Sequence, residues 1–282
     1  MITEIEKQQI IEKLQEYCNR YESQNKAAKS LKDVSSATIS QALANNWELI
    51  SDEMWRNLAA QTGYNAAEWV GVETSVYKKI KALLADAQKF SNVFALTAPA
   101  GSGKTFTQKE FQENNKRTYL VCCNEFWNRK LFLQDLLSTM GKDSFGTVGE
   151  MMQDVVKSLK KQEKPLLILD EADKLSDQVL YFFITLYNQL EDSCGMILSA
   201  TDHLDKRIRR GLKLNRKGYN EIYSRIGRRC IDLKSITSSD IASVCIANGV
   251  TDKTTIKEIV LDSENDLRRV KRMIHAKKMS SN

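Results

Sequence analysis

The spacing of apolar residues in the first 65 positions predicts a helical domain. The first expected helix has apolar residues at the three- and four-residue intervals of one helix face: Ile5, Ile10, Ile11, Leu14 and Tyr17. Three further helices are expected over residues 25–31, 36–44 and 52–60. Residues 1–65 are therefore predicted to form a small helical bundle.

The middle two of these helices have the pattern of a helix-turn-helix. In AAKSLKDVSSATISQAL, Ala28 is small enough for two helices to approach closely, and Ser35 is a candidate N-cap for the second helix. The segment resembles the helix-turn-helix of phage repressors, although a Lys-Asp pair occupies the turn where a single Gly is common. A bundle used only for protein contacts remains the alternative. In the first interpretation the residues facing base edges are Ser36, Ala37, Thr38 and Gln41.

Residues 66–90 are expected to form a linking helix, after which the pattern changes. Short apolar runs alternate with helical stretches, as in a parallel sheet covered by helices on both faces. We therefore predict an α/β core over residues 91–234 and a lid of three short helices over residues 235–282. The five expected strands are residues 93–96, 118–121, 166–169, 196–198 and 230–233.

Composition and charge narrow the class of protein. Hydrophobic residues make up 42% of the 282 positions and charged residues 28%, which excludes wholesale disorder. The net charge of +6 is uneven: residues 1–60 carry 7 basic and 9 acidic side chains, whereas residues 201–282 carry 19 and 10. The last third of the chain is therefore expected to attract phosphate-bearing partners.

Cysteine spacing and hydropathy indicate a cytoplasmic protein. The six cysteines include no CxxC pair and lie beside no histidine cluster, so we expect buried thiols in a reducing compartment. No apolar run approaches the ~18 residues of a membrane span, and the N-terminus lacks a signal-peptide core. No membrane partner is predicted.

A glycine-rich loop is the strongest chemical signal. In VFALTAPAGSGKTFTQKEF an expected strand runs into a loop that opens a helix, so backbone N–H groups surround a phosphate at the positive end of the helix dipole. Lys104 is expected on the β and γ phosphates, and Thr105 is expected to hold Mg²⁺. The sequence departs from the phosphate-loop pattern only at its first position, where Ala98 replaces the usual Gly. The expected nucleotide-binding residues are Ala98, Pro99, Ala100, Gly101, Ser102, Gly103, Lys104 and Thr105.

A second motif predicts hydrolysis. PLLILDEAD is a buried strand that ends in two carboxylates. Asp170 is expected in the Mg²⁺ shell, and Glu171 is expected to orient and polarise the attacking water. ATP and Mg²⁺ are therefore the expected cofactors.

Three further segments resemble parts of the AAA+ ATPases. GMILSATD ends in Thr201, which resembles the first sensor of the γ-phosphate. YSRIGRRCIDL resembles the arginine-finger segment that completes a neighbouring subunit's site, with Arg225 as the finger and Arg228 or Arg229 as alternatives. ENDLRRVKRM resembles the second sensor, with Arg268 as its arginine. The resemblance implies an AAA+ P-loop core.

The order of these parts narrows the resemblance. A helix-turn-helix, a compact AAA+ core containing LDEADKL and IYSRIGRR, and a short lid resemble the target-DNA ATPases of transposition. That family includes phage Mu transposition protein B and, more distantly, TnsC and the IstB-type ATPases. In it, ATP drives assembly into helical filaments on duplex DNA, which recruit and activate a transposase. The resemblance implies the same partners here: duplex DNA, a transposase and further copies of the chain.

A cationic stretch is the candidate DNA surface of the core. Residues 206–229 contain ten basic residues and one acidic residue, and a solvated loop with a subunit interface is the alternative interpretation. We expect this surface, rather than the weakly charged N-terminal helices, to supply most phosphate contacts. The candidate contacts in this stretch are Lys206, Arg207, Arg209, Arg210 and Lys213, and the segment after the second expected strand adds Arg129 and Lys130.

Two other functions share many of these features. A helicase-loader or initiator-type AAA+ protein has the same ATP site and contacts DNA, but transfers it to a replicative helicase. An ATP-switched transcription regulator reads an operator through residues 25–45. Such regulators usually append a large sensing region, and only about 45 residues follow the core here.

Overall fold

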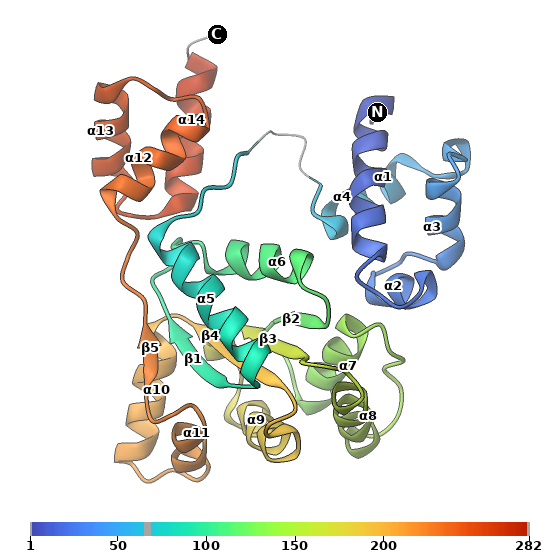
Figure 1. The fold of residues 1–282 in the computed structure, drawn as a ribbon, viewed down its shortest axis with the longest axis vertical. Helices are drawn as coiled ribbons and strands as arrows, with labels where there is room; N and C mark the ends of the chain where they lie inside the picture. The colour runs from blue at the N-terminus through green and yellow to red at the C-terminus, as the bar shows by residue number, and fades with distance from the viewer. Residues whose placement is uncertain (1, 65–68, 281–282) are drawn as a thin grey trace.

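The computed structural model describes residues 2–64 and 69–280. An N-terminal helical domain, an α/β core and a helical lid follow one another along the chain (Figure 1). The N-terminal domain and the lid lie on different sides of the core. None of the helices in these two ranges is long and apolar enough to span a membrane.

Four α-helices and a 3₁₀ turn form the N-terminal domain around Leu14, Ile39 and Trp55, whose side chains are fully buried. The N–H of Thr38 donates to Ser35 Oγ at 3.0 Å, which confirms Ser35 as a helix cap. Asp33, in the turn between the second and third helices, has a φ of 57°, the left-handed conformation for which Gly is usual. The elements are α1 (Glu4–Cys18), α2 (Gln24–Ser30), α3 (Ser36–Leu43), η1 (Trp47–Leu49) and α4 (Asp52–Thr62).

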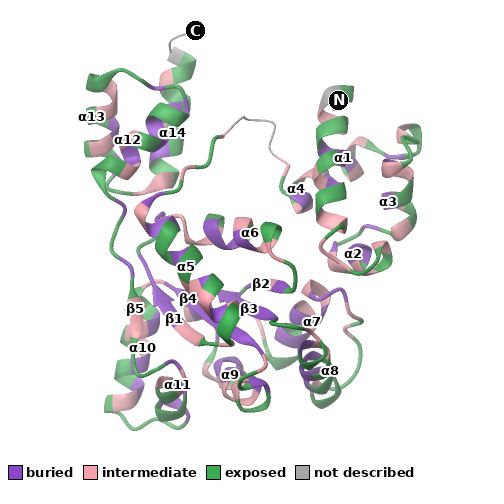
Figure 2. Cartoon of the chain, in the orientation of Figure 1, coloured by how far each residue is buried: buried purple, intermediate pink, exposed green. Residues whose placement is uncertain are grey.

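The core is a parallel five-stranded sheet, as the alternation of strands and helices predicts, and its strands lie in the order β2-β3-β4-β1-β5. Side chains alternate along a strand, so β3 packs on both faces of the sheet. Leu167 and Leu169 pack with the helices over residues 129–139, 148–160 and 177–190, whereas Leu166 and Ile168 pack with the helix over residues 75–90. Figure 2 shows the resulting concentration of buried residues along the strands. The strands are β1 (Val93–Thr97), β2 (Thr118–Cys122), β3 (Leu166–Asp170), β4 (Gly195–Ala200) and β5 (Cys230–Asp232).

The helices of the core complete both covering layers. Helix α5 lies so close to the sheet that a Cβ on Gly195 would come within 2.2 Å of the carbonyl oxygen of Ala87. Only glycine fits at that crossing. The helices are α5 (Ser75–Phe90), α6 (Lys104–Asn114), α7 (Arg129–Thr139), α8 (Val148–Lys160), η2 (Ala172–Lys174), α9 (Asp177–Leu190), α10 (Asp202–Lys213) and α11 (Tyr219–Arg225).

The connection before α5 differs from the expected linking helix over residues 66–90. Helix α5 begins only at Ser75, where Thr74 caps it by accepting the N–H of Tyr77 at 3.1 Å. Residues 69–74 precede this cap and are not helical. The expected boundary between residues 65 and 66 lies outside the described residues.

The N-terminal domain docks on the core through α2. Tyr21 donates its hydroxyl proton to the Thr139 carbonyl oxygen at 3.3 Å, and Lys29 pairs with Asp143 at 2.8 Å. Gly141 lies so close to α2 that a Cβ there would come within 2.6 Å of the Lys26 carbonyl oxygen. Helix α3 lies on the outer side of the domain, away from the core (Figure 1).

The lid has the three helices that the sequence predicts, packed around Ile241, Ile259 and Val270. It attaches to the start of α5 by two hydrogen bonds, in which the N–H and the hydroxyl of Ser75 donate to Asp240 at 2.8 and 2.7 Å. The lid helices are α12 (Ser238–Ala247), α13 (Lys253–Asp262) and α14 (Leu267–Ser280).

All six cysteines are free thiols. Cys123, Cys194 and Cys245 are buried, whereas Cys122 at the end of β2 is exposed. The expectation of buried thiols therefore holds for only half of them.

Candidate nucleotide site

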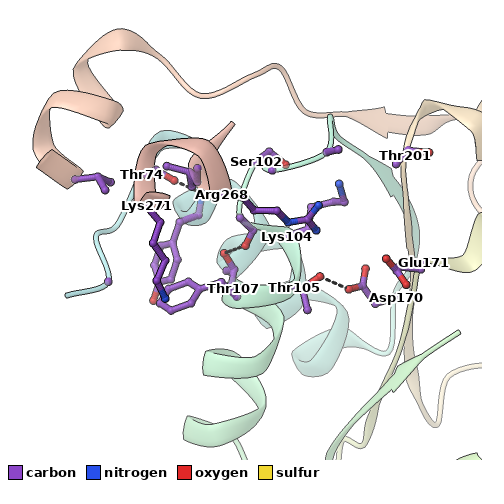
Figure 3. Close-up of a pocket in the computed structure, with 18 of the residues that line it drawn as sticks. Thr74, Ser102, Lys104, Thr105, Thr107, Asp170, Glu171, Thr201, Arg268 and Lys271 are labelled. Carbon is purple, nitrogen blue, oxygen red and sulfur yellow. Dashed lines mark hydrogen bonds between the residues drawn. The ribbon is translucent and has the colours of Figure 1, made fainter. Parts of the chain in front are cut away.

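A cavity of about 360 Å³ lies between the core and the lid. One end is formed by the loop before α6 and by the carboxyl ends of β3 and β4. The other end is formed by residues 69–72 and by apolar side chains of α6 and the lid (Figure 3). The cavity thus combines a polar end with an apolar end, the combination expected of a site for a small organic anion.

The polar end is built around the glycine-rich loop. Gly101 and Gly103 have φ values of 72° and 93°, which β-carbon-bearing residues rarely adopt. Helix α6 begins directly after Gly103, so the loop presents backbone N–H groups at a helix N-terminus. The hydroxyl of Ser102 donates to the Pro99 carbonyl at 2.8 Å and holds the loop closed on itself.

Lys104 lies inside this loop. Its ammonium donates to the carbonyl oxygens of Ala98 and Pro99, at 2.7 and 3.0 Å. Burial lowers the pKa of the Lys104 ammonium from its ordinary value, and the nearby Asp170 carboxylate offsets part of that effect. When a nucleotide binds, the Lys104 ammonium can donate to phosphate oxygens in place of these loop carbonyls.

Asp170 is held by three polar side chains from the elements around it. Thr105 Oγ1 donates to Asp170 Oδ2 at 2.6 Å, and Ser199 Oγ lies 2.8 Å from Oδ1. With its amide nitrogen facing the carboxylate, Gln108 donates to both oxygens at 3.2 and 3.3 Å, and its Oε1 lies 2.6 Å from Ser199 Oγ. Because Gln108 and Ser199 are completely buried, this network fixes the position of the carboxylate.

The same residues fit Mg²⁺. Mg²⁺ prefers oxygen ligands, and the hydroxyl of Thr105 and the carboxylate of Asp170 are adjacent, as Figure 3 shows. Asp170 is only 1% exposed and forms no ion pair with any residue that the structure describes. A buried carboxylate without a cationic partner is a suitable ligand for a divalent cation.

Glu171 follows Asp170 at the rim of the cavity. Its φ of 55° places it in the left-handed region, which costs a non-glycine residue on the order of 1 kcal/mol. The carboxylate pairs with Lys174 at 2.7 Å and its side chain is 44% exposed. A solvent-accessible carboxylate in this place can contact a water that approaches the polar end.

The two predicted sensor residues also line the cavity. Thr201 occupies the N-cap position of α10 without a capping hydrogen bond from its side chain; its hydroxyl instead donates to Asp173 Oδ2 at 2.5 Å. Arg268 enters from the lid together with Lys271. The N–H of Leu267 donates to the Gly101 carbonyl at 2.9 Å, so the start of α14 rests directly on the glycine-rich loop.

Sequence reasoning missed the apolar end and the buried network. The expected helix over residues 66–90 concealed the fact that residues 69–72 line the cavity, together with Phe106 and Val244. Gln108 was detectable, because it lies one helical turn after Lys104 on the same face. Ser199 was detectable as a hydroxyl within the apolar run of a buried strand.

Arg225 lies outside the cavity of its own chain. Its Nε and one terminal nitrogen donate to Asn188 Oδ1 at 3.0 and 2.8 Å, and its guanidinium stands 5.4 Å from the ring centroid of Tyr187. Arg228 and Arg229 are exposed, and their side chains form no hydrogen bond or ion pair with the residues that the structure describes. The described lining of the cavity includes none of these three arginines.

The candidate DNA contacts fall on three separate parts of the molecule. Arg129 and Lys130 are exposed at the start of α7, which packs on the β2 edge of the sheet. Ser36, Thr38 and Gln41 lie on α3, away from both other groups (Figure 1). The remaining candidates lie on α10, near β1 and the opposite edge: Lys206, Arg207, Arg209, Arg210 and Lys213.

Arg207 differs from its neighbours on α10 because it is engaged inside the core. Its Nε donates to the Tyr219 hydroxyl at 3.0 Å, one terminal nitrogen donates to the Leu175 carbonyl at 2.5 Å, and the guanidinium pairs with Asp177. Burial acts to raise the pKa of Asp177, but hydrogen bonds from Tyr219 and Arg207 outweigh it and leave that pKa lowered. The Arg207 guanidinium is therefore occupied within the core, unlike the exposed cations of α10.

Comparison with known proteins agrees with this geometry. No curated protein matches the chain. Residues 88–208, however, match the family model described as an AAA domain. This range contains the loop around Lys104, Asp170 with Glu171, and Thr201. Together with the parallel sheet and the phosphate-binding loop, the match identifies this part of the chain as an AAA-type P-loop ATPase domain.

Proposed function

We propose that this protein is an ATP-dependent DNA-binding ATPase of DNA transposition. In this proposal it assembles with ATP on target duplex DNA, and the assembly recruits and activates a transposase. The recruitment step is inferred from the resemblance to transposition ATPases. The ATP and DNA steps are inferred from the site and from the surface charge.

The nucleotide chemistry follows from the arrangement at the polar end. Lys104 and the N–H groups of the loop bind the β and γ phosphates, while Thr105 and Asp170 hold Mg²⁺. The metal, when bound, neutralises phosphate charge. Glu171 orients the attacking water, and Thr201 and Arg268 contact the γ-phosphate from α10 and the lid.

Hydrolysis in this proposal requires a second copy of the chain. Arg225 does not line the cavity of its own chain, which supports a role at a neighbour's site. An arginine in this role stabilises the charge of the transition state and contributes about 10³- to 10⁵-fold in rate in related NTPases. Arg228 and Arg229 are the alternative fingers.

One observation carries the link between ATP and DNA. Thr201, beside the expected γ-phosphate, is the N-cap of α10, and α10 carries exposed Lys206, Arg209, Arg210 and Lys213. Lys206 and Arg209 pair with acidic residues of their own helix, whereas Arg210 and Lys213 form no ion pair among the described residues. Binding or loss of the γ-phosphate at Thr201 can therefore shift α10, whose unpaired Arg210 and Lys213 are available to DNA phosphates.

A binding experiment tests the proposal. Fluorescence anisotropy with random-sequence duplex DNA should show tight binding with ATP and weak binding with ADP. The affinity should fall steeply with salt, because binding through phosphates releases counterions. Arg210→Glu with Lys213→Glu should abolish binding, whereas the control Lys160→Glu on α8 should not. ATP-independent binding that needs only α3 and depends on DNA sequence would instead support a transcription regulator.

A further inference from the structure

Residues 69–74 form an extended strap along the apolar end of the cavity. Trp69, Val70, Gly71, Val72 and Thr74 all line the cavity. The strap ends where Thr74 caps α5, and the N–H of Thr74 donates to the Val72 carbonyl at 2.9 Å. When the phosphates of the proposed ATP occupy the loop around Lys104, this end is the part of the cavity that remains for the base.

A single side chain of the lid fixes the middle of the strap. Asn248, at the end of α12, accepts the N–H of Val70 through Oδ1 at 3.0 Å and donates from Nδ2 to the Val70 carbonyl at 3.0 Å. Nδ2 also donates to the Val244 carbonyl at 2.9 Å. The side chain is only 3% exposed. Its amide therefore satisfies both backbone groups of Val70, as a neighbouring strand would.

Other contacts hold the two sides of the strap. Gly71 packs on α6 so closely that a Cβ there would lie 2.6 Å from Phe106 Cζ. The ammonium of Lys271, on α14, stands 5.2 Å from the ring centroid of Trp69. The strap thus lies between the core and the lid, and the two hydrogen bonds between Asn248 and Val70 fix its distance from the lid.

We propose that Asn248 is a positioning residue for the nucleobase: it holds the strap so that the apolar end of the cavity fits a base. This inference rests on the proposed binding of ATP in this cavity. Asn248 itself does not line the cavity, and it contacts neither Lys104 nor Arg268. Its contribution should therefore appear in the affinity for a complete nucleotide and be absent from the affinity for a phosphate chain.

Near the phosphate end, the lid is held to the core by hydrogen bonds that do not involve Asn248. Asp240 still holds Ser75 by two hydrogen bonds, and Leu267 still donates to Gly101. Arg268 therefore stays near the glycine-rich loop in an Asn248 variant. This separation between the two ends makes a selective effect measurable.

Calorimetry with two ligands tests the role of Asn248. The full-length protein is titrated with ATP and, separately, with inorganic triphosphate, both with Mg²⁺. Asn248→Ala should raise the Kd for ATP about tenfold, the equivalent of about 1.4 kcal/mol, and change the Kd for triphosphate less than about twofold. Asn248→Asp keeps the size of the side chain but cannot donate to Val70, so it should show the same selective loss. The control is Ser243→Ala, an exposed hydroxyl on the same helix that bonds only within α12.

The outcomes separate this inference from the proposed function. Equal weakening of both ligands in both variants, or an unchanged Kd for ATP, overturns the role of Asn248 and leaves ATP binding intact. Wild-type protein that binds neither ligand overturns the proposed function and this inference with it. If Asn248→Ala unfolds, as judged by circular dichroism, the Asp variant decides the question alone.

Discussion

Replacing Gln108 by Leu tests how the site holds its metal. Gln108 is completely buried behind Asp170, and its amide nitrogen donates to both carboxylate oxygens at 3.2 and 3.3 Å. Leu has a similar volume and removes these two donors without opening a cavity. Ser199 and Thr105 then remain the only described side chains that hydrogen-bond to Asp170.

The expected loss follows from the geometry. Hydrogen bonds to charged groups contribute about 1.5 to 3 kcal/mol each, and the two here are long, so we expect a combined loss of about 1.5 kcal/mol in holding the carboxylate. That corresponds to roughly tenfold in the Mg²⁺ concentration that half-saturates hydrolysis, within the ~10- to 100-fold typical of residues that orient metal ligands. The free energy of unfolding should also fall, because the buried Asp170 carboxylate loses two hydrogen-bond donors and Leu supplies none.

The assay is ATP hydrolysis titrated with Mg²⁺ at saturating ATP, with thermal unfolding measured in parallel. Gln112→Leu, one turn further along α6 and half-buried, is the matched control and should behave as wild type. A folded Gln108→Leu protein whose half-saturating Mg²⁺ stays within twofold of wild type would refute the argument. Asp170 would then be positioned by its own strand and not by the network.

Three further predictions concern single residues of the site and core. Burial lowers the pKa of Lys104, and only the charged ammonium attracts phosphate. The ATP affinity measured by calorimetry should therefore fall as the pH rises through this lowered pKa, at a lower pH than that at which an exposed lysine titrates. Lys104→Arg stays charged and should lack this decline. Arg225→Ala should lose hydrolysis at least about 10³-fold while still binding ATP, and mixing it with Glu171→Gln protein should restore activity in co-assembled subunits; if mixing restores none, the finger is Arg228 or Arg229. Arg207→Ala should lower the free energy of unfolding by about 1 kcal/mol in urea denaturation, because it removes hydrogen bonds to Tyr219 and Leu175 and a pairing with Asp177 that solvent partly screens; a loss below about 0.5 kcal/mol would show that these contacts are unimportant.

The architecture of the core was predictable because its signals are local. Each strand is an apolar run bounded by polar residues, and the glycine-rich loop lies directly between a strand and a helix. The structure confirms the five strands and their parallel pairing. The strand order was not predictable, because pairing depends on how the whole chain closes around its core.

The apolar end of the site was missed for a related reason. Residues 69–74 contain Val and Trp at spacings that fit a helix, and only Thr74 marks the true start of α5 as its N-cap. Asn248, which hydrogen-bonds to both backbone groups of Val70, lies 178 residues later in the sequence. Arg207 illustrates the same limit, since its partners Asp177 and Tyr219 come from two other helices. Local patterns therefore predict chemistry within one element better than contacts between distant ones.

Electron microscopy of Glu171→Gln protein on random-sequence duplex DNA tests the central claim most directly. This variant keeps the metal ligands and removes the group that orients water, so ATP should bind and persist. We predict ordered, continuous assemblies along the DNA with ATP, and bare DNA with ADP or with Lys104→Ala protein. ATP-bound protein that stays monomeric and leaves the DNA bare would contradict the account.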